Sequence, residues 1–588
     1  MIGIPCTILV ALPSIVTLIL GLLGIFVFPS IYKSIVYSAV WGKLVIDVTS
    51  SEVNGGPERK MKILVLTHDD YEGTLGLSTQ MFSKPPMINQ MKFYFFNITN
   101  MDEIIYEGSQ ARVNEIGPYT YMESEDKRYL QFTEDGDQVF YENYKKWIYR
   151  SDLSCVNCDY NDIVTLPNAP QVGTSTALFD PLFHVTPTAK KIIAAALLLL
   201  GENAINSPSM GAVLFDGYDD ALLSAAHSGI VTLISNIWNG GVNIIPIPVP
   251  DMHTMAYFNG YNNSRDESYW IHTGMNDIYK LGDIINWANE SLLPSEWYPT
   301  ETARMINGSD TGSFGKVGLS ENDVLPMFHS YMCRSFNAVY QGKRDVEGVP
   351  SYTYGVMEDE WDTSLDKNKG FRYRNVEGVN YYPQWPNCPK WNHSNCKATP
   401  NDPIDCFTDL CNDCCNKGKV GDTFAVPPGF YPMVCYPGRR ESSPFAILWS
   451  TPHFLYSPST VVDSVVGIHP ELSLHQPMVY DHEPMSGLIT QVAYRAQINI
   501  PFFSNEFVMH NSHLPNAIIP IFYESSETMM TDYAYSLYRI GFVYAPIGLF
   551  WMSIAFIILS IGLSIVGCAL MVKRIRLLNA QKDMFTDM

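Results

Sequence analysis

The sequence predicts a β-rich α+β protein whose large body is held between two terminal membrane-spanning helices. Three observations lead to this fold class. No charged residue occurs in residues 1–32 or in residues 540–572 of the 588-residue chain. Strand-like patterns fill most of the stretch between these ends, and one strongly helix-forming region, residues 188–239, interrupts them. With 46% hydrophobic and 17% charged residues, the chain is expected to fold rather than stay disordered.

The first apolar segment is predicted to be a transmembrane helix over residues 6–29, after a short cytoplasmic N-terminus at residues 1–5. About 20 apolar residues in a helix cross a hydrocarbon core of roughly 30 Å. A cleaved signal peptide is the alternative, but its apolar part would be about 7 to 15 residues long and would end at small residues. This segment instead ends in the bulky sequence IFVFP. An uncleaved anchor is therefore predicted.

The second apolar segment predicts a transmembrane helix over residues 547–572. Lys573, Arg574 and Arg576 follow it directly, and such basic flanks stay on the cytoplasmic side. The tail at residues 573–588 is therefore expected in the cytoplasm, together with the N-terminus, and residues 30–542 form an extracytoplasmic ectodomain. Because the whole chain carries a net charge of −22, this ectodomain is acidic, which argues against nucleic-acid binding.

Within the ectodomain, residues 62–150 have the pattern of an antiparallel sheet. The sequence FYFF at residues 93–96 is aromatic and favours strands. Two further strand-like segments, residues 131–133 and 138–141, flank Asp135 and Gly136. An Asp-Gly pair is typical of a type I′ turn, so a tight hairpin is expected here.

The helix-forming region begins with a stretch of good helix formers, Lys190 to Leu200, and Gly201 is expected to end that helix. A second helix is expected between Asp219 and Trp238. The apolar run from Ile192 to Leu200 is too short to span a bilayer. It is either a buried helix or one face of an exposed apolar cap, and the sequence leaves both alternatives open.

Asparagine and cysteine positions agree with an extracytoplasmic body. Five asparagines lie in N-x-S/T glycosylation acceptors: Asn97, Asn262, Asn289, Asn307 and Asn392. Ten of the twelve cysteines also lie in the body, an even number that suits an oxidising compartment: Cys155, Cys158, Cys333, Cys388, Cys396, Cys406, Cys411, Cys414, Cys415 and Cys435. Six of them crowd into residues 388–415, a segment that cross-links are expected to hold.

Zinc binding is the alternative for the closely spaced cysteines. Cys411 and Cys414, and likewise Cys155 and Cys158, have the spacing of zinc ligands, but disulfides are expected in an oxidising compartment. The remaining two cysteines, Cys6 and Cys568, lie near the predicted cytoplasmic ends of the spans and are candidates for acylation. The alternative is that both are ordinary apolar residues of a helix.

No catalytic signature is present. The chain has no nucleophile elbow, no H-E-x-x-H sequence, no phosphate-binding loop and no dinucleotide-binding glycine turn. The protein is therefore expected not to be an enzyme and to need no cofactor or metal. Six of the thirteen histidines fall between His453 and His513, where they either respond to acidification or are scattered without a common role.

Ordered sequence motifs across nearly the whole chain resemble the class B scavenger receptor family. They are FNITN (96–100), EIGPYTY (115–121), the Asp135-Gly136 pair with its following aromatic residues, LFDGY (214–218), MINGSD (305–310), CRS (333–335), GVP (348–350), PHFLY (452–456), GIHP (467–470), EPMSG (483–487) and QINI (497–500). That family includes fatty acid translocase, the high-density lipoprotein receptor and a lysosomal integral membrane protein.

The resemblance implies an antiparallel β-barrel-like ectodomain with a lipid tunnel and an apical helical bundle, matched here by residues 188–239. Ligand-binding candidates on that bundle are Lys190, Lys191, Ala195 and Leu199. Few basic residues stand there, because the helix runs into Gly201-Glu202-Asn203, so the binding of anionic lipoproteins is in question. The family motifs beside Cys333 and Cys435 imply a disulfide between these two residues, while the other eight ectodomain cysteines are expected to pair in unknown order.

The function implied by the resemblance is a scavenger-type receptor that binds lipids, fatty acids, sterols or lipoproteins and passes lipid through the ectodomain to the membrane. A protein ligand at the apical helices and a homo-oligomer are left open. The alternative is a two-span ion channel subunit with a disulfide-bonded ectodomain, and an ectoenzyme, without any motif behind it, is third. The expected location is the plasma membrane or the lysosomal or endosomal membrane, with two passes and both termini in the cytoplasm.

Overall fold

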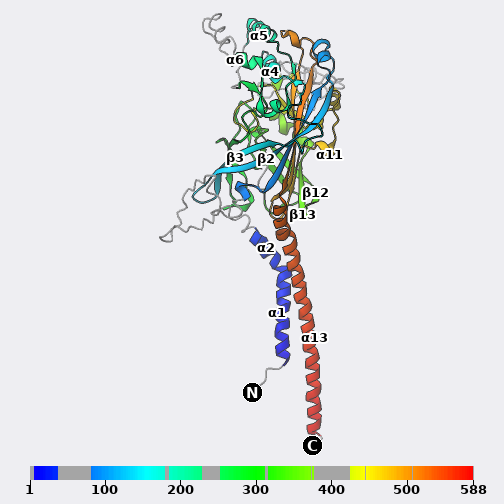
Figure 1. Cartoon of the computed structure of the whole chain (residues 1–588). Coiled ribbons are helices and arrows are strands. Elements are labelled where there is room, and N and C mark those ends of the chain that lie inside the picture. The colour runs from blue at the N-terminus through cyan, green and yellow to red at the C-terminus, as the bar shows by residue number, and fades with distance from the viewer. Residues whose placement is uncertain are drawn as a thin grey trace, which may run out of the picture.

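The computed structural model of the chain describes residues 6–36, 81–178, 185–227, 252–310, 315–363, 365–372, 374–375, 424–443, 445–505 and 507–586. Strands form a rounded body at one end, and two long helices leave it side by side, so that the N- and C-termini lie together at the far end (Figure 1). The expectation of a β-rich α+β fold with a barrel-like sheet is confirmed.

One fourteen-stranded sheet builds the body. Its main path runs β10 (Ser309–Asp310), β11 (Val324–His329), β12 (Arg334–Val346), β13 (Val349–Val356), β18 (Met478–His482), β19 (Ile489–Phe502), β20 (Ala517–Met530), β1 (Met87–Ile98), β2 (Val113–Phe132), β3 (Gln138–Tyr149), β8 (Ser264–His272) and β9 (Ile284–Trp287), with β16 (Phe430–Pro432) and β17 (Leu448–Ser450) attached at β19. All neighbours pair antiparallel except β10 and β11.

The two ends of this path meet, so the sheet is a nearly closed barrel. The amide of Ile284 in β9 donates to the carbonyl of Gly308 at 2.8 Å, and Asp283 and Ser309 form an isolated antiparallel bridge. Across the same seam the Tyr141 hydroxyl donates to the Asp310 carboxylate at 2.9 Å. Side chains alternate between the two faces of a strand, so every second residue points into the barrel.

Shorter strand pairs and helical segments complete the body. The pairs are β4 (Leu166–Pro167) with β5 (Ile205–Asn206), β6 (Tyr218–Asp219) with β7 (Thr254–Met255), and β14 (Arg374–Asn375) with β15 (Phe424–Ala425). The short helical segments are η3 (Glu103–Glu107), η6 (Ile278–Lys280), α8 (Glu301–Arg304), α9 (Glu358–Trp361), η7 (Asp366–Phe371), η9 (Pro452–Phe454), α10 (Ser459–Val462), α11 (Leu472–His475) and η10 (Met509–Asn511).

Helices gather at the end of the body opposite to the two long helices (Figure 1). They are α4 (Ala169–Ala177), α5 (Pro187–Leu199), the π-helical turn η5 (Ala212–Asp216) and α6 (Ala221–His227). Thr186 caps α5 by accepting a hydrogen bond from the amide of Ala189, with a proline in the first turn. Gly201 follows α5 at φ +72°, where glycine is favoured, as the sequence predicted. Of the second expected helix, α6 accounts for the first part, and residues 228–238 lie outside the described residues.

The hairpin at Asp135 and Gly136 forms, but its turn differs from the expected type I′. Strands β2 and β3 are joined by the five residues 133–137, and of the expected turn pair only Gly136 has a positive φ. The Asp135 side chain explains the difference, because it accepts hydrogen bonds from the Thr133 hydroxyl at 2.6 Å and the Asp137 amide at 3.1 Å. These bonds fix a longer loop than the dipeptide pattern indicates.

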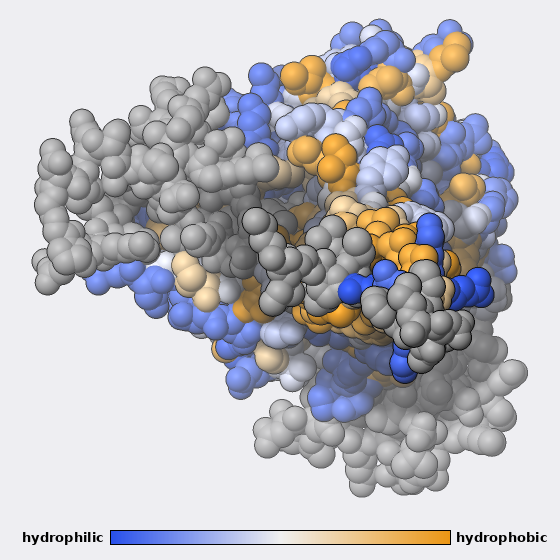
Figure 2. Space-filling model, turned by 90° about the horizontal axis from the view of Figure 1, so that it is seen from below, coloured by the Kyte–Doolittle hydropathy of each residue, from blue (hydrophilic) through white to orange (hydrophobic). Residues whose placement is uncertain are grey.

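The chain ends in one very long helical rod. Helix α12 (Asp532–Tyr538) continues through η11 (Arg539–Tyr544) into α13 (Ala545–Thr586), and its residues to Lys582 are long and apolar enough to cross a membrane. At the other end α1 (Cys6–Phe26) is bent by 50° from α2 (Phe28–Val36), and the two qualify as a span only when taken as one bent pair. Seen from below, hydrophobic residues gather near the middle of the view, while most of the surrounding coloured surface is hydrophilic (Figure 2).

Small residues let α1 and α13 approach closely. The Ser14 hydroxyl donates to the Ser560 carbonyl at 2.9 Å, and Ser560 returns the bond to the Ser14 carbonyl at 2.8 Å. A Cβ atom on Gly24 would lie 2.0 Å from the Ser553 hydroxyl, so only glycine fits there. Such small-residue contacts are typical of helix pairs in membranes, where burial of apolar surface alone does not drive association.

Candidate functional site

A polar cavity of about 110 Å³ lies inside the barrel, near the end that leads to the two long helices. Its position follows from the lining residues, which include the first residues of β1 and the last inward residues of β20, the strand that runs into α12. The full lining is Pro85, Met87, Asn89, Met91, Glu123, Glu125, Lys145, His329, Tyr331, Tyr480, Val492, Tyr494, Glu524, Ser526 and Thr528. Ionisable and aromatic side chains therefore dominate the interior at this level.

Two lysines pair with three of the carboxyl groups around this cavity. The ammonium group of Lys127, whose side chain is fully buried, lies 2.5 Å from the carboxylate of Glu125. Lys145 is shared, because its ammonium nitrogen is 3.6 Å from Glu123 and 3.9 Å from Asp266. A buried charge is tolerated only where such partners compensate the loss of water. The pKa of each carboxyl group here therefore depends on the balance between its burial and the charge of the nearby ammonium groups.

The pKa values of these carboxyl groups diverge accordingly. Burial opposes the ionisation of Glu125, but the charges of Lys127 and Lys145 outweigh it and lower its pKa to about 2. Burial raises the pKa of Asp266 to about 8 against the opposing charge of Lys145. Burial also raises the pKa of Glu524 to about 8, and the nearby carboxylate of Glu123 adds to the shift. Two of the four carboxyl groups are thus poised to hold a proton at neutral pH.

Aromatic side chains fill the barrel interior beyond this cavity, on the side away from the two long terminal helices. Phe93 lies at the centre, with ring centroids 5.8 Å from Tyr121, 5.6 Å from Phe522 and 5.8 Å from Phe258. Tyr257 packs against Phe522 at 5.2 Å. All five are at most 8% exposed. We call these five residues the aromatic plug, and it separates the polar cavity from the helical end in the part of the chain that the structure describes.

A second polar site, which we call the histidine groove, lies on the outer face of β1, β2, β19 and β20, with a volume of about 790 Å³. At its base the His453 ring lies 2.6 Å from the Glu115 carboxylate, which also accepts a hydrogen bond from the Tyr523 hydroxyl at 3.2 Å. The His453 and His475 rings stack at 4.3 Å. Of the six histidines between His453 and His513, three line this groove, and the rings of His453 and His475 are in contact.

The two stacked histidines also hold the loop that carries α11. The Nδ1 atom of His453 accepts a hydrogen bond from the amide of His469 at 3.0 Å. The Nδ1 atom of His475 accepts one from the amide of Glu471 at 2.9 Å. Burial, together with the neighbouring His453, lowers the pKa of His475 to about 4. Both rings therefore bind a backbone amide of this loop through Nδ1.

The four predicted ligand-binding residues lie on α5, which has one buried face and one exposed face. Ile193, Ala194 and Leu197 pack inward, whereas Leu199 is 86% exposed. Ala195 and Lys191 are also exposed, and the ammonium group of Lys190 lies 5.7 Å from the ring of Phe507. The helix is thus neither wholly buried nor a free apolar rod. Its exposed apolar residues remain candidates for ligand contact.

Two disulfides are formed among the residues that the structure describes. Cys333 and Cys435 are bonded across 102 residues, the pair that the family resemblance implied. Cys155 and Cys158 are bonded to each other, so neither sulfur is free to bind zinc. The six cysteines between residues 388 and 415 lie outside the described residues. Cys568 is unpaired and exposed, and its acylation, like that of Cys6, remains a prediction.

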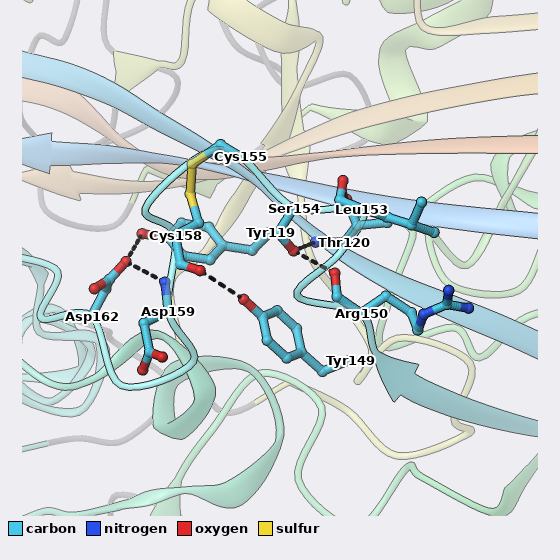
Figure 3. The surroundings of a disulfide bond; sticks show 10 residues. All are labelled: Tyr119, Thr120, Tyr149, Arg150, Leu153, Ser154, Cys155, Cys158, Asp159 and Asp162. Carbon is cyan, nitrogen blue, oxygen red and sulfur yellow. Dashed lines mark hydrogen bonds between the residues drawn. A yellow bond between two sulfur atoms is a disulfide. The ribbon is translucent and has the colours of Figure 1, made fainter.

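The Cys155–Cys158 loop is fastened to β2 mainly by hydrogen bonds (Figure 3). The amide of Thr120 donates to the Ser154 hydroxyl at 3.0 Å, and the Thr120 hydroxyl donates to the Leu153 carbonyl at 2.9 Å. The Tyr119 hydroxyl donates to the Asp162 carboxylate at 2.9 Å, which also accepts from the Asp159 amide. The loop therefore belongs to the structural support of the barrel.

Four of the five predicted glycosylation acceptors lie in the described body. Asn262 and Asn289 are exposed, and Asn97 and Asn307 are half-buried. Asn97 and Asn262 accept backbone hydrogen bonds, from Thr165 at 2.8 Å and from Trp147 at 3.0 Å. Asn392 lies outside the described residues. Glycosylation of all five stays a prediction.

Sequence reasoning missed the cavity in the barrel. A signal was present, because Glu123, Glu125 and Lys127 alternate along one strand and therefore share one face. Alternation alone does not say whether that face points to water or into the barrel. Glu524 directly follows the largely apolar run of residues 517–523 and was not singled out.

Comparison with known proteins gives one family. The family model described as "CD36 family" matches residues 72–571. "Uncharacterized protein R07B1.3" of Caenorhabditis elegans is 40% identical over 83% of this chain and 88% of its own length. "Lysosome membrane protein 2" of Homo sapiens is 25% identical over 75% of each chain, and "Scavenger receptor class B member 1" of Rattus norvegicus is 22% identical over 87% of this chain and 83% of its own.

By their names, the human relative is a lysosome membrane protein and the rat relative is a scavenger receptor, in agreement with the prediction of a receptor rather than an enzyme. The resemblance drawn from the ordered motifs is confirmed, since the family model covers most of the chain and both halves of the barrel. The chain belongs to the CD36 family of membrane scavenger receptors.

Proposed function

We propose that this protein is a two-pass membrane receptor that binds lipids or lipoproteins and passes lipid through its ectodomain to the bilayer. The observation that carries the proposal is the cavity inside the barrel, at the end that leads directly into α12 and α13. A lipid leaving the barrel there reaches the membrane without crossing water. Family membership supports the same reading.

The proposed topology places residues 30–542 outside the cytoplasm and residues 6–29 and 547–572 in the membrane. The exposed apolar residues of α5, above all Leu199, are the proposed entry surface for a lipid or a protein ligand. Both the plasma membrane and the lysosomal or endosomal membrane fit this topology. A homo-oligomer is compatible with it.

The aromatic plug sets a condition on lipid transfer. Phe93 and its neighbours occupy the barrel interior between α5 and the polar cavity, so a lipid that enters at the helical end must displace them. Transfer is therefore expected to require rotation of these rings or an entry point in the barrel wall. Such a rearrangement is compatible with close packing only if the rings have a second well-packed arrangement.

The test is lipid transfer by the full chain reconstituted in liposomes. Fluorescent sterol and fatty acid are supplied outside, and uptake and ion flux are recorded in parallel. Thr528→Trp places an indole in the cavity and is expected to reduce lipid uptake several-fold. Met529→Trp, the matched control on the opposite face of β20, is expected to leave it unchanged.

Lipid uptake that Thr528→Trp does not reduce would refute passage through the barrel. Ion flux without lipid uptake would favour the ion channel alternative. Both variants are first compared with the unmodified protein for glycosylation and surface level, so that a folding defect is not mistaken for a blocked path.

A further inference from the structure

The polar cavity has more carboxyl groups than ammonium groups around it. Four carboxyl groups surround two ammonium groups, and among the described residues Glu524 forms no ion pair with any of them. Its side chain is 9% exposed and lines the cavity directly. Burying an unpaired carboxylate is costly, so this group needs either a proton or a cation.

Three described residues of the cavity lining also carry buried polar atoms without a partner. Within the described part of the chain, the hydroxyl groups of Tyr331 and Tyr480 and the Nδ1 atom of His329 have no hydrogen-bond partner. These three side chains line the cavity and are at most 8% exposed. Buried polar groups are nearly always paired. These three unpaired atoms therefore favour a bound molecule with hydrogen-bonding groups in or beside the cavity. At about 110 Å³ the cavity holds several waters or a small polar group.

The aromatic walls define the kind of cation. The ammonium nitrogen of Lys145 lies 4.6 Å from the centre of the Tyr331 ring, so the site already stabilises one ammonium group on an aromatic face. Tyr494 adds a further ring, stacked 4.3 Å from His329. Met91 and Val492 supply apolar contacts. A carboxylate beside aromatic and apolar walls is the setting that recognises organic ammonium ions.

A metal ion fits these walls less well. Oxygen ligands of a metal must converge on one point at about 2.0–2.6 Å. No group of three or more His, Cys, Asp or Glu side chains in the described residues has that arrangement. The four carboxyl groups come from three strands, β2, β8 and β20, and tyrosines also line the space between them. An anionic fatty acid fits least, since its carboxylate would meet Glu123 and Glu524.

We infer that this cavity binds an organic ammonium group, from a small amine or from the head group of a cationic lipid, with Glu524 as its counter-ion. The inference deepens the proposed lipid-receptor function, and its lipid source rests on that function. The cavity lies at the end of the barrel that leads into α12, so a lipid can place its head group there while its chain extends toward the membrane.

The experiment measures binding to the purified full chain in maltoside micelles, with phosphate buffer so that no other amine is present. The probes are tritiated sphingosine, palmitate and hexadecanol, which share a long chain and differ in the charge of the head group. Butylammonium, with butanol as its uncharged control, competes for the site. Sphingosine is expected to bind more tightly than both other lipids, and butylammonium but not butanol to displace it.

Glu524→Gln keeps the shape of the side chain and removes the counter-ion, so it is expected to weaken sphingosine binding roughly tenfold. The matched control is Glu527→Gln, three residues further along β20, whose carboxylate faces outward and pairs with Lys92 at 2.6 Å. It is expected to bind sphingosine as the unmodified protein does. Thermal unfolding of both variants checks their folding.

Each outcome decides the inference. Equal binding of sphingosine, palmitate and hexadecanol, or unchanged amine binding by Glu524→Gln, overturns it and leaves the cavity neutralised by protons alone. If Glu524→Gln does not fold, displacement by butylammonium but not by butanol still separates an ammonium site from a general lipid site. Sterol transfer without preferential binding of amines would refute the ammonium site but would still support the proposed function. Butylammonium binding without transfer of any lipid would support the ammonium site but refute the proposed function.

Discussion

The polar cavity and the histidine groove lie on opposite faces of the same strands. Among the described residues, a buried carboxyl group of the groove has hydrogen-bond donors beside it and one of the cavity has none. Tyr523 and Glu524 are consecutive in β20, yet the first faces the groove and the second the cavity. In the groove, Glu115 has His453 and Tyr523 as donors, and these hydrogen bonds outweigh burial and lower its pKa. In the cavity, Glu524 has no such donor and burial raises its pKa to about 8. For these two glutamates, the presence of hydrogen-bond donors beside the carboxylate, rather than the residue type, decides the direction of the pKa shift.

The largest effect is expected from removing a cation of the cavity. Lys127→Met leaves Glu125 buried without its ammonium partner at 2.5 Å. Breaking such a buried pair is expected to lower the free energy of unfolding by about 3–5 kcal/mol. Lys146→Met, on the exposed face of β3, is the control and is expected to change it by less than about 0.5 kcal/mol. Chemical unfolding of the purified chain measures both, and equal effects would contradict the ionic account of the cavity.

A smaller loss is expected in the groove. His453→Gln removes the ring that joins Glu115 to the loop carrying α11, and is expected to cost about 1–3 kcal/mol. His469→Gln changes an exposed ring whose residue takes part only through its backbone amide, so little change is expected. The same unfolding experiment compares them. A loss at His469 as large as that at His453 would show that the stacked pair does not hold the loop.

The two regions are expected to respond to pH with opposite signs. The folded pKa of His475, about 4, is below the ordinary 6.5, so its contribution to stability is lost as the pH falls from about 6.5 to 4. The folded pKa values of Asp266 and Glu524, about 8, are above their ordinary values, so their contribution is lost as the pH rises from about 4 to 8.

Unfolding temperatures between pH 4 and pH 9 measure this difference. His475→Asn keeps an acceptor at the position of Nδ1 and is expected to flatten the acid side of the curve. Glu524→Gln is expected to flatten the alkaline side. In the groove, Glu115, Glu471, Arg495 and His453 face His475, and in the cavity Glu123 and Lys145 act on Glu524. If both variants flatten the same side of the curve of unfolding temperature against pH, the opposite pH responses assigned to the two regions are wrong.

The smallest effects come from two tyrosine hydroxyls. Tyr523→Phe removes a hydrogen bond to Glu115 at 3.2 Å and is expected to cost about 1 kcal/mol. Tyr480→Phe removes a buried hydroxyl without a partner among the described residues, so it is expected to be neutral or to stabilise by up to about 1 kcal/mol. Calorimetry of the two variants decides whether the cavity hydroxyls are unpaired. If Tyr480→Phe lost as much stability as Tyr523→Phe, the Tyr480 hydroxyl would have a partner bound in the cavity.

The sequence by itself determined the features that depend on local composition. Uncharged runs predicted the apolar end segments, because a helix in hydrocarbon cannot carry charge at low cost. Alternation and aromatic content predicted a β-rich body, and the helix around Lys190 to Leu200 appeared with the expected stop at Gly201. Ordered family motifs identified the family that the comparison confirms.

Only the tertiary structure decided which charges are buried together. Glu123 and Glu524 are about 400 residues apart in the chain and line one cavity because β2 and β20 flank β1 in the barrel. Likewise, Glu115 meets His453 across 338 residues. The turn after β2 depended on the Asp135 side chain, which a dipeptide pattern does not weigh. Charge pairing depends on strand order and on the face that closes inward, and local sequence encodes neither of them.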